Sequence, residues 1–422
     1  MSIVNMMSTG TSGIAAEGQA LSVAGDNIAN VNTVGFKSQR AIFGDMLGRS
    51  SGAGSGAGAG VRVTTVQSLF TQGALSSTGV ASDLAIEGEG FFVVKGVAGG
   101  VDGQYYSRAG QFRFDKEGYF TTPSGLKAQG YATLGDGKFD TTMTPLKLPS
   151  LTVAPTATSK IALVGNLDSS APVIAGGFSA ARPGETSNFS TTVTVYDSVG
   201  KAHALNAYFT KTADATAAQD ATWTYNITST EAGLSGASLG TGTISYAADG
   251  KLASHTPAAL TINFQGAQPQ TIGINLGTVG ALDGMSSFAI GSAINTQTQD
   301  GARVGELQGV EVDAQGTMRG IYSNGQKLDV GMMALAKFAS NDGLSRVGNG
   351  AWASTDRSGE AAIGMARTGG RGMINAGSLE QSNVDLAQQF VDLISHQRAF
   401  QANSKTITTA DDMLQEIVNL KR

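Results

Sequence analysis

The two ends of the chain carry apolar residues at a spacing of seven, and this spacing constrains the fold more than any other feature. A seven-residue repeat keeps apolar side chains on one face of a helix and is typical of helices that pack side by side. The two stripes are Met7, Ile14, Leu21 and Ile28 near the start, and Leu379, Leu386, Leu393, Phe400, Ile407 and Leu414 near the end. They predict helices over residues 1–30 and 379–420 that pair with each other or with neighbouring molecules, which indicates assembly rather than catalysis.

The N-terminal helix is predicted by periodicity but not by helix propensity. It contains four glycines, each of which destabilises a helix by roughly 0.5–1 kcal/mol relative to alanine, at Gly10, Gly13, Gly18 and Gly25. Only Glu17 and Asp26 are charged before Lys37, so the helix has almost no solvated face. An ordinary intramolecular helix pair would satisfy the spacing alone, but the lack of charge favours a helix that several neighbours bury. We expect it to end near Asn30–Gly35, where left-handed backbone is tolerated.

Composition excludes several classes of protein. With 41% apolar residues the chain is not wholly disordered, and its 58 glycines indicate many turns and short strands. A formal net charge of -5 argues against a nucleic-acid partner. Without cysteine the chain forms no disulfide, thiolate metal site or cysteine nucleophile. The N-terminus lacks the basic and apolar segments of a secretory signal, and no apolar run approaches the roughly 20 residues that span a bilayer, so we expect no membrane insertion and no cleaved signal peptide.

Between the two ends the period changes to two, which indicates β-strands separated by Gly/Asp turns. Strands are predicted at residues 61–66, 91–95, 104–108, 111–114, 119–122, 223–228 and 260–266, with a hairpin at 191–212. The Ser/Gly-rich stretch 50–60 is predicted to be a flexible linker, and the Pro/Thr-rich stretch 148–159 a domain boundary. The order of elements is nested, so the simplest arrangement joins the termini and makes the middle an insertion.

Chemistry-bearing residues form no convincing catalytic pattern. The three histidines, His203, His255 and His396, are scattered and belong to no metal-ligand cluster. The Ser-x-x-Lys spacing at Ser124–Lys127 and Ser198–Lys201 lacks the companion motifs of serine acyl-enzymes. We therefore predict no catalytic, cofactor-binding or metal-binding residues, and a protein that is not an enzyme.

Several stretches of the chain match known motifs more specifically than periodicity does. They are Asp26–Lys37 (DNIANVNTVGFK) near the start, and Leu379–Leu386 (LEQSNVDL) and Gln397–Lys405 (QRAFQANSK) near the end. These signatures resemble those of the flagellar axial protein family, which comprises rod, hook and hook-associated proteins. Internal stretches resemble the family's shared inner β domain, at Gly88–Phe92, Tyr106–Phe112, Tyr322–Gln326 and Ala334–Phe338. Thr192–Ser198 with Gly200–His203 resembles the outer domain of the hook members.

The resemblance implies an α+β multidomain fold, with terminal α-helices in a coiled-coil-like inner domain and two mainly β domains nested between them. The expected divisions are an inner helical polymerisation domain (1–30 and 379–422), a connecting region (31–70 and 364–378), an inner β domain (71–150 and 301–363) and an outer β domain (151–300).

The function implied is that of a structural subunit of the bacterial flagellar hook, an extracellular helical homopolymer that serves as a flexible universal joint between rod and filament. Implied partners are other copies of the chain, the distal rod protein, the hook cap protein, the hook–filament junction protein and the flagellar type III export apparatus. The alternatives are another axial protein, such as a rod-like variant, and a secreted β-rich adhesin or enzyme with helical ends.

Three groups of residues are expected to carry this function. The polymer interface is predicted at both stripes apart from Leu379. The joint between the N-terminal helix and the domains that follow is predicted at Asn27, Asn30, Asn32, Gly35, Phe36 and Lys37. The C-terminal signature residues are Glu380, Ser382, Asn383, Val384, Asp385, Gln397 and Asn403.

Overall fold

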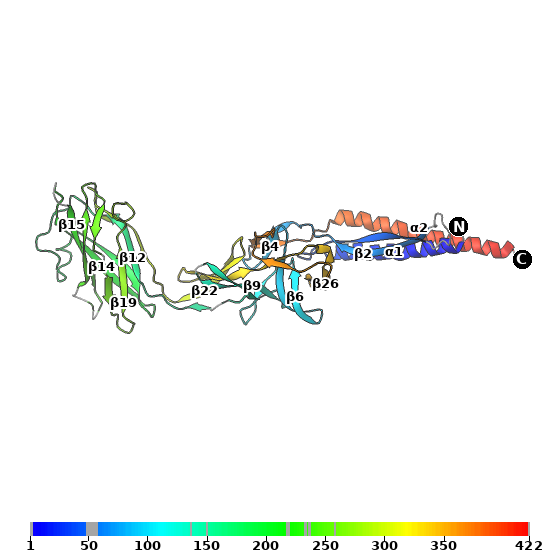
Figure 1. Ribbon diagram of the computed structural model, residues 1–422, viewed down its shortest axis with the longest axis horizontal. Helices are drawn as coiled ribbons and strands as arrows, with labels where there is room; N and C mark the ends of the chain where they lie inside the picture. Colours follow the sequence, from blue (N-terminus) through cyan, green and yellow to red (C-terminus); the bar gives the residue numbers. More distant parts are fainter. Residues whose placement is uncertain are drawn as a thin grey trace. The chain divides into compact units, whose positions relative to one another are not determined.

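The computed structural model describes residues 3–47, 58–135, 137–148, 151–216, 220–231, 234, 238–256 and 259–420. The fold is α+β, as predicted: a helix begins and a helix ends the described chain, with a large β-rich region between them in the sequence, and the two helices lie side by side (Figure 1). The chain divides into two compact units, Met1–Pro149 with Gly309–Gly320 and Leu328–Arg422, and Ser150–Gln308 with Ile321–Lys327. The division into four domains predicted from the sequence stays a prediction, because the helices and the inner β strands share the first unit.

The first unit contains both helices, a long hairpin and a β-sheet. The helices are α1 (Ile3–Ala29) and α2 (Leu386–Leu420), and the hairpin is β1 (Gln39–Leu47) with β2 (Gly58–Ser68). A central antiparallel path runs β24-β9-β5-β6-β27-β26. The remaining elements have the bounds β3 (Leu75–Ser77), β4 (Leu84–Glu87), β5 (Phe91–Ala98), β6 (Val101–Ser107), β7 (Arg113–Phe114), β8 (Phe120–Thr121), β9 (Lys127–Gly135), β10 (Lys138–Pro145), β24 (Lys327–Met333), β25 (Leu335–Lys337), η1 (Asn341–Gly343), β26 (Ser345–Gly348), β27 (Ala351–Ala353), β28 (Ala362–Gly364), β29 (Met373–Ala376) and β30 (Ser378–Glu380). We call strands β4–β10 and β24–β28 the inner β domain.

The second unit is a β-sandwich. One sheet has the antiparallel order β13-β14-β15-β16-β17, and the other has the order β18-β19-β12-β20, with β21 also paired to β12. Their inner faces share one core, in which Trp223, Tyr225 and Tyr246 are almost fully buried. The bounds are β11 (Thr152–Val153), β12 (Lys160–Asn166), β13 (Phe189–Tyr196), β14 (Ala202–Ala213), β15 (Ala221–Ser229), β16 (Ser238–Tyr246), β17 (Leu252–His255), β18 (Ala259–Ile262), β19 (Gln270–Asn275), β20 (Met285–Ser286) and β21 (Ala293–Gln299). Strands β22 (Gly305–Val312) and β23 (Thr317–Tyr322) contain residues of both units, as does β24 through Lys327.

The two helices lie side by side and run antiparallel, with the β1–β2 hairpin beside α1 (Figure 1). Two glycines of α1 fix which residues of α2 lie opposite them. A Cβ added at Gly10 would lie 2.8 Å from Ile407, and one added at Gly13 would lie 2.7 Å from the Asn403 amide. The buried face of α1 therefore consists of small residues, Gly10, Gly13, Ala16, Ala20 and Ala24, together with Asn27. Glycine and alanine permit this close approach of the two backbones. In the described part of the chain neither helix carries an apolar stretch that could cross a membrane.

The seven-residue stripes do not form the contact between α1 and α2 along their whole length. Met7, Ile14, Leu21 and Ile28 are only half-buried, and so are Leu393, Ile407 and Leu414. Leu386 and Phe400 are exposed. A straight α-helix rotates such a repeat by about 20° per heptad, so one stripe cannot face a single partner over four or five heptads.

Two boundaries predicted from the sequence are wrong. The C-terminal helix begins at Leu386 rather than near 379, because Ser378–Glu380 pairs with β3 as a strand and Leu379 is buried beside it. The connecting region 31–70 contains the β1–β2 hairpin, and the Val61 backbone N–H donates a hydrogen bond to Ser12 Oγ of α1 at 3.3 Å. Gly58–Gly60 of the predicted linker belongs to β2, and residues 50–57 lie outside the described residues.

We predict opposite effects for Gly13→Ala and Gly18→Ala on the stability of the helix pair. The methyl group at position 13 would lie 2.7 Å from Asn403, and overpacking of this kind lowers the free energy of unfolding by about 1–3 kcal/mol. At position 18 a Cβ has no neighbour within 4 Å, so Gly18→Ala should raise that free energy by about 0.5–1 kcal/mol through helix propensity. Urea denaturation of the monomer, followed by circular dichroism, measures both; equal effects would contradict the register.

Candidate functional site

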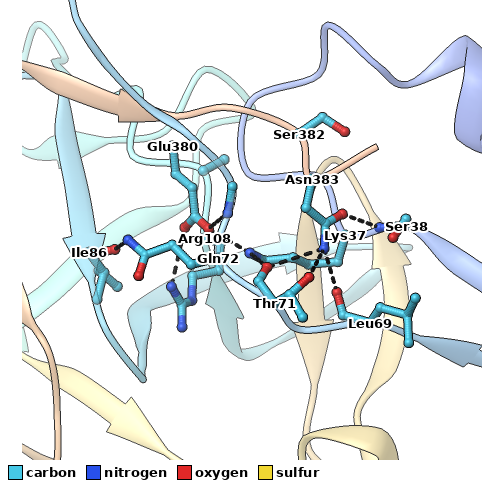
Figure 2. Close-up of polar contacts among 12 residues, drawn as sticks. Lys37, Ser38, Leu69, Thr71, Gln72, Ile86, Arg108, Glu380, Ser382 and Asn383 are labelled. Atoms are coloured by element: carbon cyan, nitrogen blue, oxygen red, sulfur yellow. Dashed lines mark hydrogen bonds and ion pairs between the residues drawn. The ribbon is translucent and has the colours of Figure 1, made fainter. Parts of the chain in front are cut away.

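Lys37 and Glu380 join the two ends of the chain in a fully buried ion pair. Lys37 Nζ lies 2.6 Å from Glu380 Oε1, and both side chains have 0% exposure (Figure 2). The ammonium also donates to the Thr71 carbonyl oxygen at 2.7 Å, and the Gly73 backbone N–H donates to Glu380 Oε1 at 2.9 Å. Burial lowers the pKa of the Lys37 ammonium below its ordinary value, although Glu380 acts in the opposite direction. The pair therefore holds residues 37, 71–73 and 380 in one fixed arrangement.

Arg108 brings the inner β domain into the same cluster. It follows β6 directly, and its Nη1 atom lies 3.2 Å from Glu380 Oε2. Its Nη2 atom donates to the Gly88 carbonyl oxygen at 2.9 Å, and its guanidinium lies 5.3 Å from the centre of the Phe91 ring. Burial lowers the pKa of this guanidinium also. A single carboxylate thus neutralises two buried cations that come from distant parts of the sequence.

Asn383 forms a second connection three residues further along. Its Oδ1 accepts the Ser38 backbone N–H at 2.7 Å. Its Nδ2 donates to the Leu69 carbonyl oxygen and to Thr71 Oγ1, each at 2.8 Å (Figure 2). The side-chain amide replaces backbone pairing where β1 starts and β2 ends. Asn383 thereby ties the base of the hairpin to the segment that leads into α2.

Asn27 connects the end of α1 to both β1 and α2. Its side chain exchanges two hydrogen bonds with the Gln39 backbone, at 2.7 and 2.8 Å, and donates to Gln389 Oε1 at 2.8 Å. Further along the helices, His396 Nδ1 lies 2.7 Å from Glu17 Oε2. These polar contacts fix the helix pair at the end nearest the inner β domain.

Gly35 allows the chain to turn from α1 into this cluster. Its φ is +68°, and an added Cβ would lie 2.5 Å from the Ala109 backbone nitrogen, so no larger residue fits. Its N–H donates to the Glu380 carbonyl oxygen at 2.8 Å. Phe36 is buried beneath Arg346, whose guanidinium lies 5.2 Å from the ring centre and pairs with Asp26 at 3.2 Å.

Most of the other residues predicted from the sequence contact only nearby residues of the chain or are exposed. Asn30 binds back to Asp26 of α1, and Asp385 accepts the N–H groups of residues 387 and 388 as the N-cap of α2. Ser382 Oγ accepts the N–H of Val384. Asn403 packs on Gly13, whereas Gln397 and Asn32 are exposed. The functional roles assigned to this set stay predictions.

Sequence reasoning did not single out Arg108, Thr71, Gly73, Gln389 or Arg346. Arg108 lies within a motif that resembles the family, but only tertiary structure reveals its carboxylate partner. A charged residue at the end of a predicted strand, shortly after its two tyrosines, in a chain with 14% charged residues, was the available signal. Thr71 and Gly73 contribute backbone groups, which no side-chain pattern encodes.

The three histidines belong to three different elements: His203 lies in β14, His255 in β17 and His396 in α2. His203 lies between Asp197 and Glu231 in the second unit, at 2.9 and 2.7 Å, and stacks on Phe264. His396 belongs to the helix pair. Within the described residues no group of three or more His, Asp or Glu side chains could hold a metal ion.

Comparison with known protein families relates four stretches of this chain to flagellar proteins. Family models match as "Flagella basal body rod protein" (residues 7–37), "Flagellar hook protein FlgE/F/G D1 domain" (85–161), "Flagellar basal body protein FlaE D2 domain" (166–302) and "Flagellar basal body rod FlgEFG protein C-terminal" (375–420). The terminal matches include the whole of the predicted joint and all of the C-terminal signature residues.

Full-length relatives are flagellar hook proteins. The chain is 36% identical to that of Escherichia coli (strain K12) and 34% identical to that of Salmonella typhimurium, in each case over 98% of this chain and 99% of the relative. It is 34% identical to that of Borreliella burgdorferi over 98% of both. The crystal structure of Helicobacter pylori flagellar hook protein FlgE2 matches 72% of this chain and 100% of its own, with a TM-score of 0.53 and 16% identity, and so supports the fold alone.

We predict that Glu380→Gln is strongly destabilising. The substitution preserves shape but leaves two buried cations uncompensated, which should lower the free energy of unfolding by about 3–5 kcal/mol. The matched control is Glu185→Gln: Glu185 pairs with Arg182, and both side chains are more than 70% exposed, so its effect should stay within about 0.5 kcal/mol. Urea denaturation measures both, and equal midpoints would contradict the proposed importance of the buried pair.

A second prediction concerns Asn383→Ala. It leaves the Ser38 N–H and the Leu69 carbonyl without their partner, and we expect a loss of about 1–3 kcal/mol in the free energy of unfolding. Asn32→Ala is the control, since Asn32 is exposed. Thermal denaturation would refute the assignment if the two variants unfolded at the same temperature.

Proposed function

This chain belongs to the flagellar hook protein family, and from that premise we propose that its two terminal helices are the surfaces through which copies polymerise. The protein is a structural subunit of the bacterial flagellar hook, the flexible tube that acts as a universal joint between rod and filament. Membership of a structural family argues against catalysis. The observation that carries the proposal is a pair of helix faces of complementary shape that the single chain leaves uncovered.

The outer face of α1 is small, uncharged and open. Positions spaced alternately by four and three carry Thr11, Ala15, Gly18, Ser22, Gly25 and Ala29. A Cβ added at Gly18 or Gly25 would meet nothing within 4 Å, in contrast to Gly10 and Gly13 on the opposite side. A spacing of four and three is the seam pattern of packed helices, so this face can accept a further helix.

The N-terminal half of α2 presents large apolar side chains to solvent. Leu386, Phe390 and Ile394 follow one another at a spacing of four and are 40%, 51% and 48% exposed. Val391 is 61% exposed. Contiguous apolar surface of this kind is typical of protein–protein contacts.

We propose that this part of α2 from one copy packs on the outer face of α1 of the next. Large side chains fit the notches left by glycine and alanine, as Ile407 fits against Gly10 within one chain. Because the two faces differ, the contact is heterologous, and repetition of it produces a ring or a helical filament rather than a closed dimer. Phe400 and Leu386 of the predicted stripe belong to the exposed surface, whereas Ile407 supports the pairing of α1 and α2 within the subunit.

The further partners remain those expected of a hook subunit: the distal rod protein, the hook cap protein and the hook–filament junction protein. Export through the flagellar type III apparatus, without a cleaved signal, is part of the same proposal. The many glycines of α1 support it, because a helix of low intrinsic propensity unfolds readily for passage through a channel.

We predict that Gly18→Leu blocks polymerisation without unfolding the monomer. The new side chain would fill the notch, and Phe390→Ser would remove the matching large residue; each should raise the critical concentration for assembly by about tenfold or more. Gly184→Leu, at a site in the second unit with nothing within 4 Å of a Cβ, is the control of equal size. Sedimentation and electron microscopy measure assembly, and circular dichroism checks the monomer. Tubes formed by Gly18→Leu at the wild-type concentration would refute the proposed interface.

A further inference from the structure

Two Asn-Gly pairs in this chain differ sharply in their surroundings. They are Asn324-Gly325, in the second unit, and Asn349-Gly350, in the turn between β26 and β27. Asparagine followed by glycine is chemically labile, because the glycine has no side chain to obstruct attack by its backbone nitrogen on the asparagine side chain. Whether such a pair reacts depends on whether the folded structure restrains the side-chain amide and that nitrogen.

The two reacting groups of the Asn349-Gly350 pair make no hydrogen bond with the described residues, although the Gly350 carbonyl oxygen accepts Ser107 Oγ at 2.9 Å. Asn349 is exposed and has a φ of +53°, and Gly350 has a φ of +69°, as in the two-residue turns that close β-hairpins. Among the described residues none hydrogen-bonds to the Asn349 side chain, and none accepts the Gly350 backbone N–H. Neither reacting group is therefore held by a hydrogen bond to a described residue, and the Asn349 side chain is exposed to water.

Asn324 and Gly325 are held in place. Asn324 Nδ2 donates to the Arg303 carbonyl oxygen at 2.9 Å and to Gln326 Oε1 at 3.0 Å, while its Oδ1 accepts the Gln326 N–H at 3.1 Å. The Gly325 N–H donates to the Tyr322 carbonyl oxygen at 2.9 Å. Reaction at this pair requires local opening that breaks these bonds.

We propose that Asn349 is a deamidation site of the folded protein. The Gly350 nitrogen, after losing its proton to solvent, attacks Cγ of Asn349; the N–Cγ bond forms, the Cγ–Nδ2 bond breaks, and Nδ2 leaves as ammonia. Water then opens the resulting five-membered imide. Cleavage of the N–Cγ bond gives aspartate, and cleavage of the bond between nitrogen and the main-chain carbonyl carbon gives isoaspartate. The only co-reactant is water.

The product places a negative charge beside the joint. Asn349 lines a cavity of about 270 Å³ together with Phe36, Lys37 and Arg346. A carboxylate there attracts Arg346 and competes with Asp26, which Arg346 binds at 3.2 Å across a partly exposed contact. Isoaspartate also lengthens the main chain within a tight turn. Deamidation thus modifies the surroundings of the α1–inner β domain joint, whatever surfaces the polymer uses.

The test compares the two Asn-Gly pairs within one sample of the intact chain. The folded protein is incubated at mildly alkaline pH in heavy-oxygen water, and peptide mapping by mass spectrometry follows replacement of the amide by a labelled carboxyl at each site. We expect Asn349 to react more than about tenfold faster than Asn324, because Asn324 reacts only after local opening. In denaturant the two rates should converge, since both pairs share the same sequence chemistry.

A control and a contrary result are available. Asn349→Gln keeps an amide but requires a slower six-membered ring, so the variant should lose the label at 349 and leave Asn324 unchanged. Equal rates at the two sites in the folded chain, or an Asn349 that stays intact while Asn324 reacts, would overturn the proposal.

Discussion

The structure of the first unit depends on one buried carboxylate. Glu380 binds Lys37 from the N-terminal segment and Arg108 from the inner β domain, while its backbone carbonyl accepts the Gly35 N–H. Burying charges is costly, and a buried ion pair adds little net stability over a well-packed apolar contact. What the cluster favours is one specific arrangement, because any arrangement that separates Glu380 from Lys37 and Arg108 removes the carboxylate from two buried cations. The ends of the chain therefore meet the β-sheet in one geometry, at which both helices begin or end.

Beyond this cluster, the contact between the two helices depends mainly on small side chains rather than on buried charges. Their contact is made by glycine and alanine, and their outer surfaces are small on α1 and large and apolar on α2. If copies pack through these faces as proposed, no interlocking polar groups hold them, and neighbouring copies could shift slightly without breaking specific bonds. A joint held by buried charges, combined with such helix contacts, would suit a tube that must bend while it transmits torque.

The sequence predicted which helices and strands are present better than it predicted where they begin and end or which residues they contact. Periodicity located both helices and most strands, since each buries one face. It placed the start of α2 too early because Leu379 continues the seven-residue spacing although it lies in β30. Only part of the β1–β2 hairpin was predicted: the strand at 61–66 lies within β2, whereas β1 was missed and Gly58–Gly60 was assigned to the glycine-rich linker. The motifs identified Lys37, Glu380 and Asn383 as important residues, but not their mutual contacts. Those contacts join residues more than 300 positions apart, and partners such as Thr71 contribute backbone atoms that composition cannot reveal.

Native-state hydrogen exchange of the monomer tests the central claim most directly. The Gly35 amide donates to the Glu380 backbone carbonyl oxygen, the Ser38 amide to the Asn383 side chain, and the Gly73 amide to the Glu380 carboxylate. If this cluster fastens the termini to the sheet, these three amides should be as strongly protected as those of β5 and β6, and should exchange only with them. Exchange of all three at the rate of freely exposed amides, while β5 and β6 stay protected, would contradict the account.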